Sequence, residues 1–196
     1  MKKIILASAS PRRRDLLASL GLEFEVYVTD VDESVTGDVA PAELVGVLAR
    51  RKAEAAAAVF PDAIVIAADT VVSTPDGKIL GKPRDDADAE RMLRRLSGGR
   101  HTVETGVCVI SDQTAAVEVV ATDVFMRDMT DEEIGDYIRT GEPRDKAGAY
   151  GIQGLGGVFV TRIEGEYFNV TGMPKEATAR MLSAVGVDVL RMNAEE

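Results

Sequence analysis

Hydroxyl and guanidinium side chains stand together where a short apolar segment gives way to a helical pattern. Residues 8–14 read Ser-Ala-Ser-Pro-Arg-Arg-Arg. Ser10 is placed to cap a helix, Pro11 suits its first position, and Gly21 can close its far end. Free amides at a helix N-terminus attract phosphate, and arginine adds donors that match phosphate oxygens. The segment therefore predicts an anion site, against the alternative of a basic, solvated first turn.

Three consecutive arginines cannot all serve such a site. Successive residues fan by roughly 100° around a helix, so neighbouring side chains point in different directions. We expect Arg12 and Arg13 to face the anion site and Arg14 to be solvated.

A second candidate is a lysine within an apolar stripe. In the helix expected over 41–60, one face carries residues at helical spacing of which only one is polar. The members of this face are Val45, Leu48, Lys52, Ala55 and Val59. A charge on a buried face needs a partner; the alternative is that the long stem of Lys52 lets its ammonium group snorkel to solvent.

Asp69 interrupts an otherwise apolar pattern, because it ends the run 63–68. A strand this apolar is typical of burial on both faces, and ligands bind at the carboxyl ends of such strands in open α/β sheets. Asp69 is therefore a candidate catalytic or metal-binding carboxylate, or else a cap of the turn after the strand. The acidic segment 30–33 offers further oxygen ligands for magnesium or manganese, unless it is a solvated loop.

Two more polar side chains lie in expected loops. Lys82, within 81–85, either meets a phosphate or lies in a plain exposed loop. Gln153 belongs to the segment 148–157, which holds five glycines and leads into a strand, so it is neither a P-loop nor a dinucleotide fingerprint. Glycines here let the backbone approach a flat ligand or turn sharply. The amide of Gln153 suits the edge of a nucleobase, or it bonds to backbone in a turn.

The single histidine and the single cysteine limit the chemistry. A multi-histidine metal centre is impossible, and His101 is expected to pack or hydrogen-bond at the start of a strand. Cys108 stands in an apolar run and is expected to be a small core residue. One cysteine also excludes an internal disulfide.

These residues are set in alternating strands and helices. Strands are expected at 3–7, 24–28, 63–68, 101–110, 115–126 and 158–163, and helices at 11–20, 41–60, 86–96, 131–140 and 174–185. Residues 74–77 carry turn chemistry for a hairpin. The pair of strands within 101–126 is joined too tightly for a helical crossover, which predicts an α/β fold with a mixed sheet.

The length and net charge of the chain limit the number of domains and the kinds of partner that it can have. The chain has 196 residues, of which 45% are hydrophobic, and we expect a single domain over 1–196. Its net charge of −10 argues against nucleic acid and anionic membranes as partners, while a small anion is still allowed. No apolar run approaches a membrane span, and the apolar stretch near residue 1 is too short for a signal peptide. We therefore expect a cytoplasmic protein.

Together these segments resemble the Maf family of nucleoside triphosphate pyrophosphatases over nearly the whole chain. The matching segments are 6–13, 48–53, 68–72, 81–85, 96–98 and 145–154. The resemblance implies a three-layer mixed sheet flanked by helices, related to inosine triphosphate pyrophosphatases, and usually a homodimer. It also implies cleavage between the α and β phosphates with a divalent metal, Mg or Mn, which releases a monophosphate and pyrophosphate.

The resemblance also implies roles for the polar residues of the candidate site. Asp69 would be the general base, and with Glu33 it would hold the metal that acidifies the attacking water. Lys52 and Lys82, with Arg13, would neutralise the triphosphate. The hydroxyl of Ser8 would bind substrate.

Three residues match the branch of the family that acts on dTTP and UTP. Arg12 follows Ser-Pro, Thr70 follows the catalytic aspartate, and Gln153 lies in the glycine-rich motif. These residues would shape the base and sugar pocket, for pyrimidine nucleoside triphosphates or modified forms of them. The branch acting on 7-methyl-GTP differs at all three places.

Two other readings stay open. One is a non-catalytic nucleotide-binding regulator, suggested by the family's link to septum formation; the other is the same chemistry on 7-methyl-GTP. The segment 169–174 departs mildly from the family pattern, which bears on packing more than on chemistry.

Overall fold

The computed structural model describes residues 2–35, 37, 39–112 and 114–194, and the chain forms two compact units. Unit 1 comprises Met1–Asp69, Thr105–Val120 and Gly172–Glu196, and unit 2 comprises Thr70–Glu104 and Ala121–Thr171. Three of the four boundary points, at 69/70, 104/105 and 120/121, fall within strands, and the fourth lies between two helices, at 171/172. The expectation of one domain over 1–196 stays a prediction.

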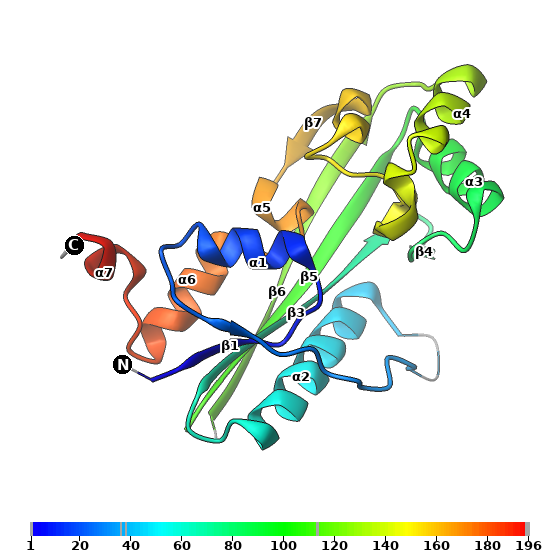
Figure 1. Ribbon diagram of the computed structural model, residues 1–196. Coiled ribbons are helices and arrows are strands. Elements are labelled where there is room, and N and C mark those ends of the chain that lie inside the picture. Colours follow the sequence, from blue (N-terminus) through cyan, green and yellow to red (C-terminus); the bar gives the residue numbers. More distant parts are fainter. Residues whose placement is uncertain (1, 36, 38, 113, 195–196) are drawn as a thin grey trace. The chain divides into compact units, whose positions relative to one another are not determined.

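The sheet is mixed, as predicted (Figure 1). Its strands are β1 (Ile4–Leu6), β2 (Glu25–Val26), β3 (Ile64–Ser73), β4 (Ile79–Leu80), β5 (Arg100–Ser111), β6 (Thr114–Met126) and β7 (Val160–Glu164). They follow the order β2-β1-β3-β5-β6-β7, with β4 paired to β3. Strand β1 is parallel to β2 and β3, whereas the β3–β4 and β6–β7 pairs are antiparallel.

The five predicted helices form close to their predicted bounds. They are α1 (Pro11–Ala18), α2 (Pro41–Val59), α3 (Asp86–Leu96), α4 (Asp131–Arg139) and α6 (Lys175–Ala184). Short elements were missed: α5 (Tyr167–Val170), α7 (Val189–Ala194) and the 3-10 helices η1 (Glu142–Asp145), η2 (Ala147–Ala149) and η3 (Leu155–Phe159). Elements of three to six residues are too short to show a helical period.

Three strands differ clearly from their predicted bounds, and the first of them, β2, covers only Glu25–Val26 of the expected 24–28. Strand β3 does not end at residue 68 but continues to Ser73, because the residues after Asp69 are again apolar and β-branched. Strand β7 begins at Val160 and not at residue 158, since η3 occupies the residues before it. The hairpin at 74–77 is confirmed: Gly77, with a φ of 80°, closes the turn that joins β3 to β4.

In unit 1, strand β1, strand β3 up to Ala68 and strand β5 from Thr105 are buried on both faces. Small side chains of α2 pack on one face, and helices α1 and α6 lie on the other side of the strands from α2 (Figure 1). The cluster beside α2 consists of Ile5, Ala7, Ala49, Ala53, Ala56, Ala63, Val65, Ala67, Cys108 and Ile110. Within the unit this is the helix, sheet and helix layering expected of the fold class.

The buried face of α2 differs from the predicted stripe. Its buried residues are Val45, Leu48, Ala49, Ala53 and Ala56, while Val59 is 51% exposed. The stripe was misplaced because alanine dominates this helix and gives little contrast between its faces. Lys52 therefore borders the buried face and does not lie at its centre.

Unit 2 has its own core, in which strand residues pack against α3 and α4. The strands supply Val72, Leu80, Val103, Val124 and Met126. As expected, His101 is buried at the start of β5, where its Nε2 lies 2.8 Å from the hydroxyl of Tyr150. Cys108 of unit 1 is a buried core residue, and burial raises the pKa of its thiol to about 12.

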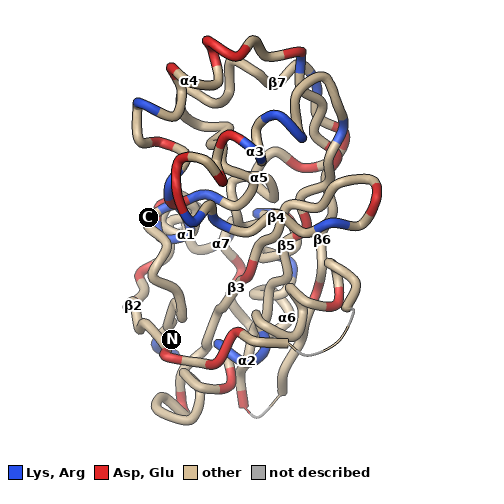
Figure 2. Tube along the Cα trace, turned by 90° about the vertical axis from the view of Figure 1, so that its right-hand side faces the viewer, with Lys and Arg blue, Asp and Glu red and all other residues tan. Residues whose placement is uncertain are grey.

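Charges of both signs are interspersed along the chain (Figure 2). Within the described ranges, every helix is too short or too polar to cross a membrane.

Replacement of Gly106 by alanine should destabilise the protein. A Cβ atom on Gly106 of β5 would lie 2.4 Å from the carbonyl oxygen of Val45 in α2, so the helix would have to move. We expect a loss of about 1–3 kcal/mol in the free energy of unfolding, measured by urea denaturation. Gly46→Ala is the matched control, because its Cβ would meet only ordinary contacts with Val119 and Val117 and alanine favours a helix. Equal stability of the two variants would contradict this reading.

The burial of His101 should make stability fall in mild acid. Burial lowers the pKa of His101 to about 4, below the ordinary value, so the unfolded chain takes up a proton first as the pH falls. The stabilisation is complete above pH ~6.5 and is lost as the pH drops toward ~4. Between pH 7 and pH 5 the wild type should lose about 2 kcal/mol more of its unfolding free energy than His101→Gln. Parallel pH profiles for the two proteins would show that this histidine is not the cause.

Candidate active site

An ammonium group held between two carboxylates forms the centre of the candidate site in unit 1. Lys52 Nζ lies 2.6 Å from Asp69 Oδ1 and 2.8 Å from Glu33 Oε1. The side chains of Lys52 and Asp69 are each 13% exposed, whereas that of Glu33 is 62% exposed. Lys52 has partners, so the snorkelling alternative does not describe it. Three predicted site residues are thus brought together.

The strand pattern explains why Asp69 meets α2. Side chains alternate along a strand, and Val65 and Ala67 of β3 pack against α2, so Asp69 points to the same side. Asp69 lies within β3 and not at its end, which corrects the expectation that it follows the strand or caps a turn. Its carboxylate stands where the apolar packing with α2 gives way to the charge of Lys52.

The acidic loop of residues 30–34 is anchored to α2 by Arg51, a residue that the sequence analysis did not single out. Arg51 Nη1 donates to the carbonyl oxygens of Asp32 (3.1 Å) and Ser34 (2.8 Å). The carboxylate of Asp32 accepts from the amide and hydroxyl of Ser34, which lowers its pKa. Asp32 is thus engaged within the loop, and Glu33 is the acid that reaches Lys52.

The start of α1 has the cap that the sequence predicts. Ser10 Oγ accepts from the amide of Arg13, and Pro11 begins the helix. The hydroxyl of Ser8, a buried residue, accepts from the amide of Ser10 at 3.2 Å and from Arg13 Nη1 at 3.5 Å. Hydroxyls and a guanidinium therefore gather at this helix N-terminus.

Arg13 is fixed in place, while its neighbours differ in exposure. Its Nε donates to the carbonyl oxygen of Gly172 at 2.8 Å. Burial lowers the pKa of the Arg13 guanidinium, and the negative charges of Asp69 and Glu33 act in the opposite direction. Arg12 is half-buried. Arg14 is exposed and lies 3.5 Å from Asp15, as expected for a solvated residue.

The other three predicted site residues belong to unit 2. Thr70 is half-buried in β3. Lys82 is exposed in the loop after β4, and the amide of Gly148 donates to the carbonyl of Gly81 beside it. Gln153 is exposed in a turn closed by a hydrogen bond from the amide of Gly154 to the carbonyl of Gly151, 3.3 Å long.

Two glycines of the glycine-rich segment, Gly154 and Gly156, lie where a side chain would collide with a neighbouring side chain. A Cβ on Gly154 would lie 2.4 Å from Glu142 Oε2, and one on Gly156 would lie 2.5 Å from the hydroxyl of Tyr137. Sequence reasoning missed both partners. The signal that was available is an acid shortly before the glycines, within the stretch Glu-Pro-Arg-Asp-Lys.

The segment that departs from the family pattern packs through Asn169. This residue is buried, and its Nδ2 donates to the carbonyl oxygen of Val103 and to Thr122 Oγ1, both at 2.9 Å. The departure is thus accommodated in the packing of unit 2.

The donor set of unit 1 fits magnesium or manganese only in part. Over the residues that the structure describes, no three His, Cys, Asp or Glu side chains come together as a ligand group. Magnesium, however, is commonly bound through one or two carboxylates plus substrate phosphates and waters. Glu33 and Asp69, which share one ammonium group, fit that lower requirement.

Ordered guanidinium, ammonium and carboxylate groups on a mixed α/β fold are typical of proteins that bind small charged ligands. The chain belongs to the family described as Maf-like protein, whose model matches residues 3–185.

Relatives named dTTP/UTP pyrophosphatase align over nearly their full length. The chain is 50% identical over 186 residues to the dTTP/UTP pyrophosphatase of Geobacillus sp. (strain WCH70), covering 95% of this chain and 100% of the relative. It is 50% identical to that of Vibrio cholerae, covering 93% and 97%. Among solved structures, that of the Staphylococcus aureus Ham1 protein matches with a TM-score of 0.47 and 20% identity, covering 65% of this chain and 73% of that one.

The Lys52–Asp69 pair should be strongly coupled for an ion pair. Both side chains are largely removed from water, so loss of Lys52 takes away the ammonium partner of Asp69, and loss of Asp69 leaves Lys52 paired only with the exposed Glu33. A double-mutant cycle of Lys52→Met and Asp69→Asn should give a coupling of about 1–3 kcal/mol in unfolding free energy.

The control for this cycle is the Arg50–Glu54 pair of the same helix, whose side chains are 58% and 51% exposed. Arg50→Met and Glu54→Gln should be coupled by no more than about 0.5 kcal/mol. A Lys52–Asp69 coupling as small as this would show that solvent screens the pair.

Proposed function

We propose that this chain is a nucleoside triphosphate pyrophosphatase that hydrolyses dTTP and UTP, or modified pyrimidine nucleotides, to the monophosphate and pyrophosphate. The family and the names of its relatives support this reaction. The structural observation that carries it is the ammonium of Lys52 held between Asp69 and Glu33.

The chemistry begins with Asp69 as the base. Water attacks the α-phosphorus, one oxygen of the Asp69 carboxylate takes the water proton, and the bond to the leaving pyrophosphate breaks. The hydrogen bond from Lys52 to Oδ1 fixes the orientation of this carboxylate. Such reactions depend on positioning and charge stabilisation, so a base with a fixed orientation accelerates the reaction more than a mobile base does.

Cationic side chains neutralise the triphosphate. In unit 1 this role falls to Lys52 and to Arg13, whose guanidinium is oriented by Ser8 and the carbonyl of Gly172. Lys82 is the exposed cation of unit 2 to which we assign the same role. Arginine remains charged at any relevant pH and binds phosphate oxygens through two parallel donors.

Glu33 and Asp69 are the residues that would hold a magnesium or manganese ion. When bound, the ion supplies a more acidic water and additional positive charge at the phosphates. The carboxylate of Glu33 is exposed and thus accessible to an ion that arrives with the nucleotide.

Recognition of the nucleoside is assigned to Arg12, Thr70 and Gln153. The amide of Gln153 meets the carbonyl and imino edge of uracil or thymine, since it carries both a donor and an acceptor. A purine is excluded by the size of its second ring. By the same family resemblance we propose a homodimer in the cytoplasm that removes unwanted nucleotides from the pool.

The test of this function is pyrophosphate release by the purified protein with magnesium or manganese. The panel contains dTTP, UTP, CTP, dCTP, ATP, GTP and 7-methyl-GTP. Selective turnover of dTTP and UTP is expected. Preference for 7-methyl-GTP would reassign the substrate, and binding of nucleotides without turnover would favour a regulator.

Asp69→Asn should abolish turnover while nucleotide binding persists. The amide keeps an oxygen for the hydrogen bond from Lys52 but cannot accept the water proton, so kcat should fall by about 10²–10⁴-fold. Calorimetric titration with UTP measures binding to the inactive variant. Asp62→Asn, at an exposed aspartate after α2, serves as control and should keep full activity. An active Asp69→Asn enzyme would remove Asp69 from the role of base.

A further inference from the structure

The carboxylate of Glu142 in η1 accepts hydrogen bonds from the glycine-rich segment and from α4. Its Oε2 accepts from the amide of Leu155 at 2.9 Å, and its Oε1 accepts from the amide of Gly156 at 3.0 Å. Oε1 also accepts from the hydroxyl of Tyr137 at 2.8 Å. Three donors from two segments thus converge on one carboxylate.

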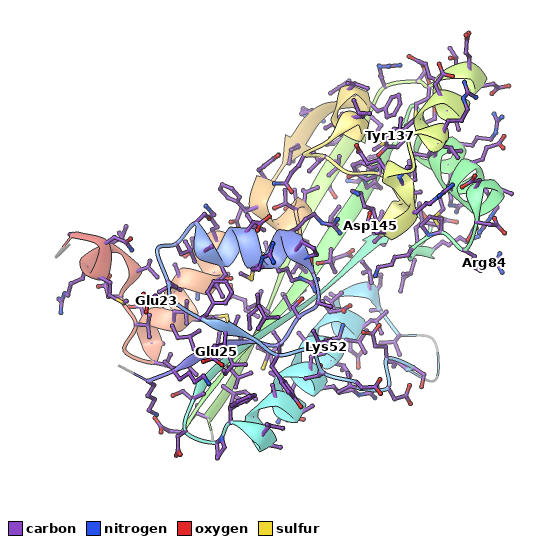
Figure 3. The ribbon with its side chains drawn as sticks, in the orientation of Figure 1. Glu23, Glu25, Lys52, Arg84, Tyr137 and Asp145 are labelled. Atoms are coloured by element: carbon purple, nitrogen blue, oxygen red, sulfur yellow. The ribbon has the colours of Figure 1, made fainter. Side chains whose placement is uncertain are left out.

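Tyr137 of α4 extends this network to the other end of the turn. Its hydroxyl accepts from the amide of Gly151 at 3.1 Å, and its ring packs edge-on against Phe159. The figure places Tyr137 beside the yellow segment that follows α4 (Figure 3). The turn is therefore held at Gly151 by Tyr137 and at Leu155 and Gly156 by Glu142. Gln153 lies between these points.

Glu142 is itself held from its backbone side. Lys146 Nζ donates to the carbonyl oxygen of Glu142 at 2.9 Å. A Cβ on Gly151 would lie 2.5 Å from Lys146 Cε, so this glycine is needed to admit the lysine stem. The acid and the turn that it holds are thus packed as one piece of unit 2.

The donors suit a charged acceptor. Burial opposes ionisation of Glu142, but the hydrogen bonds from Gly156, Leu155 and Tyr137 outweigh it and lower the pKa of the carboxyl. An ionised carboxylate accepts hydrogen bonds through both oxygens and donates none. A glutamine in its place would direct its NH2 group at N–H or O–H donors.

We infer that Glu142, with Tyr137, is a positioning residue that presents Gln153 to the pyrimidine base. The inference rests on the proposed function, because the contact between Gln153 and the base is part of that proposal. Glu142 and Tyr137 act through the backbone of the turn from which Gln153 projects, because they bond to the amides of Gly151, Leu155 and Gly156.

Glu142→Gln should therefore weaken discrimination at the base edge. UTP and CTP differ at the edge that Gln153 reads, so the ratio of their kcat/KM values reports its placement. We expect this ratio to fall about tenfold through a higher KM for UTP, with kcat changed by less than about threefold. Tyr137→Phe, which keeps the ring, should give a smaller change in the same direction. Glu132→Gln, at an exposed acid of α4, should change neither quantity.

A double-mutant cycle separates positioning from general damage. In a Gln153→Ala background, Glu142→Gln should cause no further loss of UTP preference, because the side chain that it positions is gone. Additive losses would overturn the inference. So would a Glu142→Gln enzyme that loses kcat and stability while keeping the wild-type ratio.

Hydrogen exchange tests the same inference without activity. The amides of Leu155 and Gly156 should exchange faster in Glu142→Gln than in the wild type, while the amides of α3 are unchanged. Unchanged exchange at Leu155 and Gly156 would overturn the inference. A wild type that releases no pyrophosphate would reject the proposed function instead, and the exchange result would still decide whether Glu142 orders the turn.

Discussion

The ion pair between Lys52 and Asp69 is the interaction on which the candidate site depends. An ammonium and a carboxylate that are both largely withdrawn from water each require the other, since the desolvation of an unpaired ion is costly. Both are placed by backbone packing: Asp69 by the alternation of β3 and Lys52 by the contact of α2 with that strand. The small alanine side chains of α2 let the helix pack closely on β3. The distance between Lys52 and Asp69 is therefore set by residues that are themselves unreactive.

Much of this arrangement can be predicted from the sequence. The apolar run before Asp69, the Ser-Pro start of α1 and the lysine in an otherwise apolar helix each break a simple pattern, and each was predicted as a site residue for that reason. The mixed sheet followed from the short connection between β5 and β6. Local rules suffice here because capping and strand alternation act over only a few residues.

Other features depend on contacts between distant segments. The apolar, β-branched residues after Asp69 favour a strand that continues, but an aspartate within an apolar strand looks like a strand end until its partner on α2 is known. The buried face of α2 could not be identified from its sequence, because alanine occurs on several faces of this helix and gives little contrast between them. The glycines of residues 151–156 predict the close approach of a ligand or a sharp turn, and the structure adds contacts that the sequence does not show, with Glu142, Lys146 and Tyr137. The hydrogen bonds from the amides of Leu155 and Gly156 to Glu142 could not be predicted, because contacts with backbone amides leave no periodic pattern in the sequence.

The close approach of Gly106 to Val45 has a consequence for how this sequence can change over evolutionary time. Val45 lies on the same helix as Lys52, seven residues before it. A methyl group at position 106 would displace α2 and with it the ammonium that orients Asp69. Although position 106 has no side chain, selection therefore acts on it as it acts on Lys52 and Asp69. A substitution there is tolerated only if it leaves the distance between the Lys52 ammonium and the Asp69 carboxylate unchanged.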